Sequence, residues 1–178
     1  MPAREQVHMI AGMDPALTTR QLDEPGPWHE RLPHFRHGFL PSSGDELQSE
    51  YFVPREAARE ALAALRELAN EIEPLLHVTE LRAIAGDDLW LSGAYGGTVL
   101  GVHFTWLRRP SEVARLLPKI EERLLSLGAR PHWGKLFAAG ATQLASLFPR
   151  WNEFTSLRTR FDPDGRLANP WTARVLGR

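Results

Sequence analysis

Five polar side chains of this sequence have the types and spacings to bind a molecule rich in hydroxyl groups: Glu80, Arg82, His103, Thr105 and Lys135. Residues two apart on a β-strand share a face, so Glu80 and Arg82 would project together, as would His103 and Thr105. A carboxylate accepts hydrogen bonds from hydroxyls, and a guanidinium donates through a planar fork. An imidazole can take a proton near neutral pH, and a lysine favours the alkoxide as a hydroxyl proton leaves. The pattern therefore predicts a pocket that binds a polyol and polarises one hydroxyl.

Taken alone, each of these residues favours an ordinary structural interpretation. Glu80 and Arg82 could form an ion pair on a solvated strand face, where such pairs contribute little to stability. His103 could be a hydrogen-bonded residue of the core or of a sheet edge, and Lys135 could be a surface lysine. The convergence of all five on one pocket is a hypothesis about the tertiary structure.

A metal site is the alternative suggested by a second group, His29, Glu30, His34 and His37. This group lacks the His-Glu-x-x-His spacing that puts two ligands one helical turn apart, and Pro33 opposes a helix there. We therefore expect no metal site.

Common nucleotide and thiol chemistries have no counterpart in the sequence. The glycine-rich segment 93–97 has no following helix to receive a phosphate, so it predicts a hairpin turn. The chain has no cysteine, which excludes disulfides, thiolate nucleophiles and iron–sulfur clusters. No feature of the residues themselves suggests a way to hold a redox cofactor.

Three segments are predicted to form the strands that carry the polar residues. Alternation and β-branched residues indicate strands at 46–53 and 76–85, and a hairpin over 89–107 whose second strand carries His103 and Thr105. A further short strand is possible at 5–12, followed by a loop-like stretch over 13–46.

Apolar residues at helical spacing predict the helices. One helix begins at Pro54 and ends at Pro74, and another begins at Ser111 and ends before Gly128. Pro118 should kink this second helix or confine it to the part that follows. Two shorter helices are predicted after it, near 141–148 and in the segment that carries Trp151, Phe154, Leu157 and Phe161.

The order of these elements predicts the fold class. Consecutive strands without an intervening helix favour an antiparallel sheet, so we expect an α+β fold with helices packed on one face and a helical C-terminal tail. The length of 178 residues suits one domain, with or without an appendage.

The charge and the apolar pattern of the sequence argue against binding to nucleic acid and against insertion into a membrane. The formal charge of −1 and the scattered basic residues argue against a nucleic-acid-binding protein. The first thirty residues contain no long apolar run, which argues against a signal peptide or membrane span. We therefore expect a cytoplasmic protein.

Several segments together resemble the C-terminal part of flavin-dependent alditol (xylitol) oxidases. These enzymes belong to the vanillyl-alcohol-oxidase-like group, which includes sugar-lactone oxidases such as D-arabinono-lactone oxidase. The two most specific segments run from His103 to Trp106 and from Ala129 to Lys135. The others are Gly26 to Arg36, Glu46 to Tyr51, Glu80 to Arg82, Asp88 to Ser92, Ala94 to Gly96 and the more widely shared Asp162-Pro163-x-Gly165 with Asn169.

The resemblance implies roles for the five polar residues. Glu80, Arg82 and Lys135 would surround the reacting terminal hydroxyl of a polyol such as xylitol or sorbitol, and His103 and Thr105 would hold hydroxyls further along. The positive charges of Arg82 and Lys135 would favour loss of the hydroxyl proton. Apart from the resemblance, we infer that His103 is a candidate to accept that proton, which would make Arg82, Lys135 and His103 the catalytic residues. The complete enzyme would transfer a hydride to FAD and release an aldose and hydrogen peroxide.

The resemblance also implies that the chain lacks the flavin domain, which precedes the substrate domain in the family. We expect residues 1–135 to be a partial substrate-binding (cap) domain and 136–178 a segment that would pack on the absent flavin domain. The chain alone would then bind no FAD and be inactive. The stripe of Trp151, Phe154, Leu157 and Phe161 would be exposed and could drive homodimerisation.

Two other functions fit the same residues. The chain could be a stand-alone sugar- or polyol-binding module without redox chemistry, or a degenerate fragment with a structural role.

Overall fold

The computed structural model describes residues 4–8, 14–18, 20–22, 24–27, 30–31 and 45–177, and the chain divides into two compact units, residues 1–46 and 47–178. In the first unit, the 3₁₀ helix η1 (Pro15–Leu17) is capped by the Asp14 side chain, which accepts a hydrogen bond from the Ala16 N–H. The described residues of the predicted 5–12 strand are not in a strand, and the rest of that segment lies outside the described residues.

The second unit contains a four-stranded antiparallel sheet in the order β2-β3-β1-β4. Its strands are β1 (Leu47–Pro54), β2 (Leu76–Ile84), β3 (Val99–Trp106) and the short β4 (Arg130–Pro131). The prediction of an α+β fold built on an antiparallel sheet is confirmed. Most residues of the central strand β3 and many of β1 are buried. Both strands are hydrogen-bonded to a neighbouring strand on each side.

The prediction of a hairpin over 89–107 is wrong about the first strand, because the residues that follow 89 do not form a strand paired with β3. β3 pairs with β2, and residues 85–98 form the connection between them. Turns fold this connection tightly: the Asp87 N–H donates to the Ala94 carbonyl, and the Ser92 hydroxyl donates to the Asp87 carboxylate. A Cβ on Gly86 would lie 2.7 Å from the carbonyl carbon of Gly97, so only glycine allows this backbone approach.

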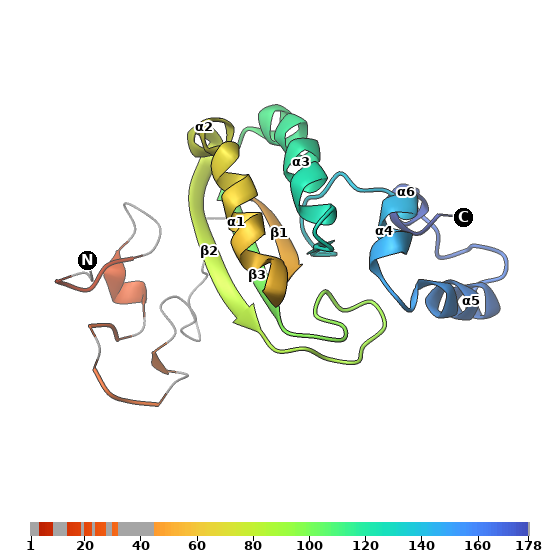
Figure 1. The fold of residues 1–178 in the computed structure, drawn as a ribbon, viewed down its shortest axis with the longest axis horizontal. Coiled ribbons are helices and arrows are strands. Elements are labelled where there is room, and N and C mark those ends of the chain that lie inside the picture. The colour runs from red at the N-terminus through yellow and green to blue at the C-terminus, as the bar shows by residue number, and fades with distance from the viewer. Residues whose placement is uncertain are drawn as a thin grey trace. The chain divides into compact units, whose positions relative to one another are not determined.

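Helices cover one face of the sheet (Figure 1). The first group is η3 (Arg55–Ala57), α1 (Ala58–Glu67), α2 (Ala69–Ile72) and η4 (Glu73–Leu75), and the long helix α3 (Pro110–Leu125) lies beside α1. Alternate residues of β1 and β3 point into this layer and form the main core with the apolar stripe of α3. The core includes Tyr51, Val53, Val102, Phe104, Trp106, Val113, Leu116, Leu117, Ile120 and Leu124.

Helix α3 is continuous across Pro118, so the predicted restriction to the part after this proline is wrong. A proline inside a helix removes one backbone hydrogen bond. The neighbouring Leu117 and Ile120 are buried, and this packing offsets the loss.

The chain ends in three shorter helices, α4 (Ala141–Leu147), α5 (Trp151–Phe161) and α6 (Pro170–Leu176), which confirms a helical C-terminal region. They enclose a second core of Phe137, Ala139, Leu144, Phe148, Trp151 and Val175. The prediction that Trp151 is exposed is therefore wrong, because its ring packs near Phe148. Leu157 and Phe161 are 40% and 76% exposed, as the predicted stripe requires.

Among the described residues, none of the helices has the length and apolar character needed to cross a bilayer.

Candidate functional site

The face of the sheet opposite the helices brings charged residues of three strands side by side. Glu50 of β1 and Glu80 of β2 are the cross-strand partners of His103 on β3. Arg82 lies two residues beyond Glu80 on the same face, opposite Gly101. The sequence spacing predicted which residues share a strand face, and the register decides that these faces are contiguous.

Lys135 reaches the cluster because the segment after β4 is fixed to β1. The His132 N–H donates to the Glu50 carbonyl at 2.9 Å, and the Leu136 N–H donates to the Gln48 carbonyl at 2.8 Å. Between these two bonds the chain turns, and the Lys135 ammonium donates to Glu50 Oε2 at 2.5 Å. All five predicted site residues therefore lie in one neighbourhood.

Glu50 joins the positive charges of this cluster. Its Oε1 accepts from Arg82 Nη1 at 3.1 Å, while its Oε2 accepts from Lys135. Burial alone raises the pKa of the Glu50 carboxyl, but contacts with His103 and Lys135 and the charges of Lys135 and Arg82 outweigh it and lower the pKa from 4.5 to about 2. Glu50 is therefore a carboxylate at any pH near neutrality. Arg82 also donates from Nη2 to Glu80 Oε2 at 2.7 Å.

Both ring nitrogens of His103 have partners. Nδ1 lies 2.8 Å from the Lys135 ammonium and 3.4 Å from Glu50 Oε2, and Nε2 lies 3.1 Å from Thr105 Oγ1. A proton exchanged with His103 must therefore pass through one of these neighbours.

The cluster has a buried layer and an accessible layer. The side chains of Glu50 and His103 are 5% and 4% exposed, and Thr105 is also buried. The side chains of Arg82, Glu80 and Lys135 are 32%, 17% and 16% exposed. A molecule arriving from solvent can therefore meet Arg82, Glu80 and Lys135, which lie in front of the buried residues.

Sequence reasoning missed Glu50 as a site residue. The available signal was alternation in β1, where Ser49, Tyr51 and Val53 face the core and Glu50 faces the other side. An isolated glutamate on a strand usually faces solvent, so only the register with His103 identifies it.

His132 lies at the edge of the cluster. Its Nδ1 accepts a hydrogen bond from the Gly134 N–H at 3.0 Å, and its ring lies 5.8 Å from that of Phe52. Burial and the nearby Lys135 charge lower the His132 pKa, which favours the neutral ring.

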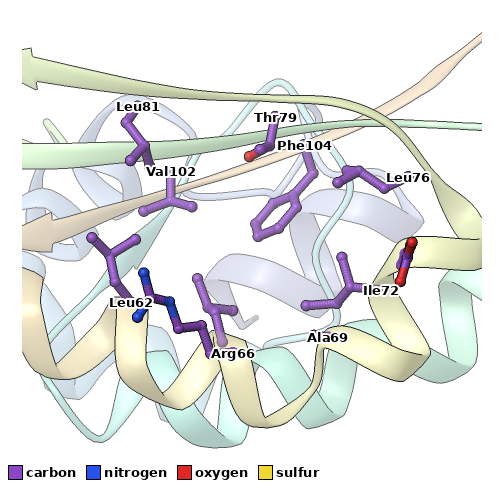
Figure 2. Close-up of a pocket in the computed structure, with 11 residues that line it drawn as sticks. Leu62, Arg66, Ala69, Ile72, Leu76, Thr79, Leu81, Val102 and Phe104 are labelled. Atoms are coloured by element: carbon purple, nitrogen blue, oxygen red, sulfur yellow. The ribbon is translucent and has the colours of Figure 1, made fainter. Parts of the chain in front are cut away.

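An apolar groove of about 540 Å³ lies on the opposite, helix-covered face (Figure 2). Figure 2 shows Leu62 and Arg66 of α1 on one side and Leu81 and Val102 of the sheet on the other. A polyol needs several hydrogen-bonding partners, so the polar cluster suits it and the groove does not.

No group of His, Asp or Glu able to hold a metal ion occurs in the described part of the chain. Of the alternative metal group, only Glu30 is described, and His29, His34 and His37 lie outside the described residues.

Comparison with known proteins identifies the family. The model of the D-arabinono-1,4-lactone oxidase family matches residues 45–175, which include the whole polar cluster. The chain belongs to the D-arabinono-1,4-lactone oxidase family.

Comparison with individual proteins agrees with this match. The chain is 41% identical to the alditol oxidase of a Streptomyces species over 175 residues, covering 98% of this chain and 42% of the relative. It is 36% identical to the L-gulono-1,4-lactone dehydrogenase of Mycobacterium tuberculosis over 133 residues, or 73% of this chain and 30% of that protein. Bovine L-gulonolactone oxidase is 27% identical over 133 residues, with 71% and 30% covered. The chain thus spans less than half the length of these relatives.

Proposed function

We propose that this chain supplies the alcohol-binding side of an FAD-dependent polyol oxidase that converts alditols such as xylitol and sorbitol, with oxygen, to aldoses and hydrogen peroxide. The observation that carries the proposal is the continuous contact from Glu80 through Arg82 and Glu50 to Lys135 and His103. Similarity to an alditol oxidase over 98% of the chain supports the substrate class.

In this proposal the accessible layer binds the reacting hydroxyl. Arg82 and Lys135 donate to the hydroxyl oxygen and stabilise negative charge on it, and the Glu80 carboxylate accepts from a hydroxyl. His103 and Thr105 are buried and paired with each other, so in this proposal they position the residues in front of them and do not contact the polyol. The polyol is thereby fixed with one terminal carbinol beside the cationic pair.

The hydroxyl proton passes to His103 by way of Lys135. The ammonium first gives a proton to His103 Nδ1, at 2.8 Å, and becomes a neutral amine. The amine then takes the hydroxyl proton and is again an ammonium. Glu50, 3.4 Å from Nδ1, stabilises the resulting imidazolium.

The chemistry that FAD would supply, when bound in the complete enzyme, is acceptance of a hydride. The cluster offers hydrogen-bonding groups suited to an alcohol, and the described residues include no glycine-rich loop that opens a helix to bind the FAD pyrophosphate. In this proposal other parts of the parent enzyme hold FAD, and this chain binds and orients the polyol.

A chimeric enzyme tests the function. The region of the Streptomyces alditol oxidase that aligns with this chain is replaced by this chain, and flavin reduction by xylitol and sorbitol is followed anaerobically in a stopped-flow instrument. We expect polyol-dependent bleaching of the flavin. Lys135→Met should slow flavin reduction about a hundredfold or more, because the group that stabilises the alkoxide is lost.

Lys119→Met is the matched control, because Lys119 is an exposed lysine of α3 that pairs with Glu71. It should reduce flavin at the rate of the unmodified chimera. A folded chimera with bound flavin that does not react with polyols, or a Lys135→Met variant with unchanged rate, would refute the proposal. Calorimetry of xylitol with the isolated chain tests the alternative of a stand-alone polyol-binding module. Tight binding of xylitol in the absence of flavin would favour that alternative.

A further inference from the structure

Glu50 is the most connected charged group of the polar cluster. It is only 4% exposed, and its two oxygens lie within 3.4 Å of atoms of Arg82, Lys135 and His103. A buried carboxylate is costly unless it is paired, so its contacts determine which arrangement of the cluster is stable.

The donor inventory of Lys135 fixes the direction of the hydrogen bonds. An ammonium has three hydrogens and no lone pair, so His103 Nδ1, at 2.8 Å from it, must be the acceptor. A neutral imidazole with a free lone pair on Nδ1 carries its hydrogen on Nε2. That hydrogen is then donated to Thr105 Oγ1 at 3.1 Å.

The opposite tautomer conflicts with this geometry. A hydrogen on Nδ1 could reach Glu50 Oε2 only over 3.4 Å, and it would also face the hydrogens of the Lys135 ammonium. With Nδ1 unprotonated, the ammonium donates to two acceptors, Oε2 at 2.5 Å and Nδ1 at 2.8 Å, and so bridges them.

We propose that Glu50 is a positioning residue that holds the Lys135 ammonium against His103 and thereby fixes His103 as the neutral tautomer with its hydrogen on Nε2. The inference about the tautomer stands on this chain alone, whereas its catalytic consequence rests on the proposed function.

The catalytic consequence of this arrangement is that it fixes how many hydrogens of the Lys135 ammonium remain for a ligand. Two hydrogens of Lys135 are committed to Glu50 and His103, and the third remains for a ligand oxygen. The lone pair of His103 Nδ1 faces Lys135, so the imidazole receives a ligand proton only through that lysine. Glu50 is thus required for the order of the proton steps, although it touches neither the ligand nor the cofactor.

Nitrogen NMR of the 178-residue chain tests the tautomer directly. Long-range ¹H–¹⁵N spectra, recorded at a pH where the ring is neutral, distinguish a protonated ring nitrogen from an unprotonated one, and His103→Gln assigns the signals. We expect His103 with a protonated Nε2 and an unprotonated Nδ1. A hydrogen on Nδ1 in the unmodified chain would overturn the proposal.

Glu50→Gln tests whether the carboxylate fixes this state, with Glu121→Gln as the matched control. Glu121 is equally buried, at 3% exposed, and lies on the helix-covered side of the sheet, where it accepts from Tyr51. We expect Glu50→Gln to shift His103 towards protonation on Nδ1 and Glu121→Gln to leave its spectrum unchanged. An unchanged His103 signal in a folded Glu50→Gln chain would contradict the proposal. If Glu50→Gln does not fold, Lys135→Met provides the same test, because it frees Nδ1 to donate to Glu50.

In the chimeric enzyme, Glu50→Gln should slow flavin reduction about a hundredfold by misplacing Lys135 and leave the KM for xylitol within a few-fold. Glu121→Gln should leave the rate unchanged. Because the NMR experiment needs neither polyol nor flavin, an inactive chimera would refute the proposed function without affecting the tautomer. An active chimera with unchanged kinetics in Glu50→Gln would refute the positioning role alone.

Discussion

At the scale of single residues, the polar cluster depends on a glycine, Gly101, as well as on its charged residues. Gly101 lies between Phe52 and Arg82 in the sheet register. A Cβ at this position would come within 3.1 Å of Glu50 Oε1 and within 3.0 Å of Ile84 Cδ1. Glycine here leaves room for the carboxylate that accepts from Arg82.

Gly101→Ala should therefore weaken the cluster without adding or removing charge. The methyl group must displace Glu50 Oε1 or Ile84, and we expect a loss of about 1 kcal/mol in the free energy of unfolding, measured by urea denaturation. The chimeric enzyme should also reduce its flavin more slowly with xylitol, because the Cβ displaces Glu50. Gly97→Ala is the control, because no atom lies within 4 Å of a Cβ built there. Equal stability of the two variants would contradict the steric explanation.

At the scale of elements, the Lys135 segment is attached to both layers of the fold. Backbone bonds join it to β1, and the Ala138 N–H donates to the Glu121 carboxylate of α3 at 2.6 Å. The Tyr51 hydroxyl donates to the same oxygen at 2.8 Å. Burial raises the pKa of Glu121, and its hydrogen bonds only partly oppose this effect.

Glu121 should make stability depend on pH. Because its pKa is raised on folding, the folded chain binds its proton more tightly, and the protein loses stability as pH rises from 4.5 through the raised pKa. Glu121→Gln keeps an acceptor oxygen and removes the titration. Its free energy of unfolding relative to the unmodified chain should therefore rise from pH 4 to pH 7. A difference independent of pH, in urea denaturation at several pH values, would rule this explanation out.

At the scale of the whole molecule, the C-terminal helices combine a buried core with exposed apolar side chains. Trp151 and Phe148 are buried in this region, but Phe161, Leu167 and Trp171 are 76%, 79% and 41% exposed. The predicted homodimer therefore stays a prediction, and Trp151 is not part of the exposed surface that it would use. The proposed packing of 136–178 on a flavin domain would use the same side chains.

Sedimentation velocity over a range of concentrations tests this association. We expect reversible self-association of the isolated chain, and Phe161→Ser should weaken it about tenfold by removing one large apolar side chain. Leu89→Ser is the control, because Leu89 is 66% exposed but lies in the β2–β3 connection. A single monomeric species at every concentration would exclude the dimer.

Local periodicity predicted much of this protein correctly. Alternation placed Glu80 with Arg82 and His103 with Thr105, and helical spacing predicted the buried stripe of α3. These features depend on neighbours a few residues apart, because backbone periodicity alone sets which residues of a strand or helix share a face. Together with the residue motifs, they were sufficient to predict an α+β fold and the family to which the chain belongs.

Only the tertiary structure decided which faces meet. Pairing β3 with β2 instead of with residues near 89 puts Glu80 opposite His103, and pairing it with β1 brings in Glu50. The burial of Trp151 depends likewise on packing between helices far apart in the sequence. Strand partners and helix contacts depend on the burial of apolar surface and the satisfaction of hydrogen bonds across the whole second unit, and no local pattern contains that information.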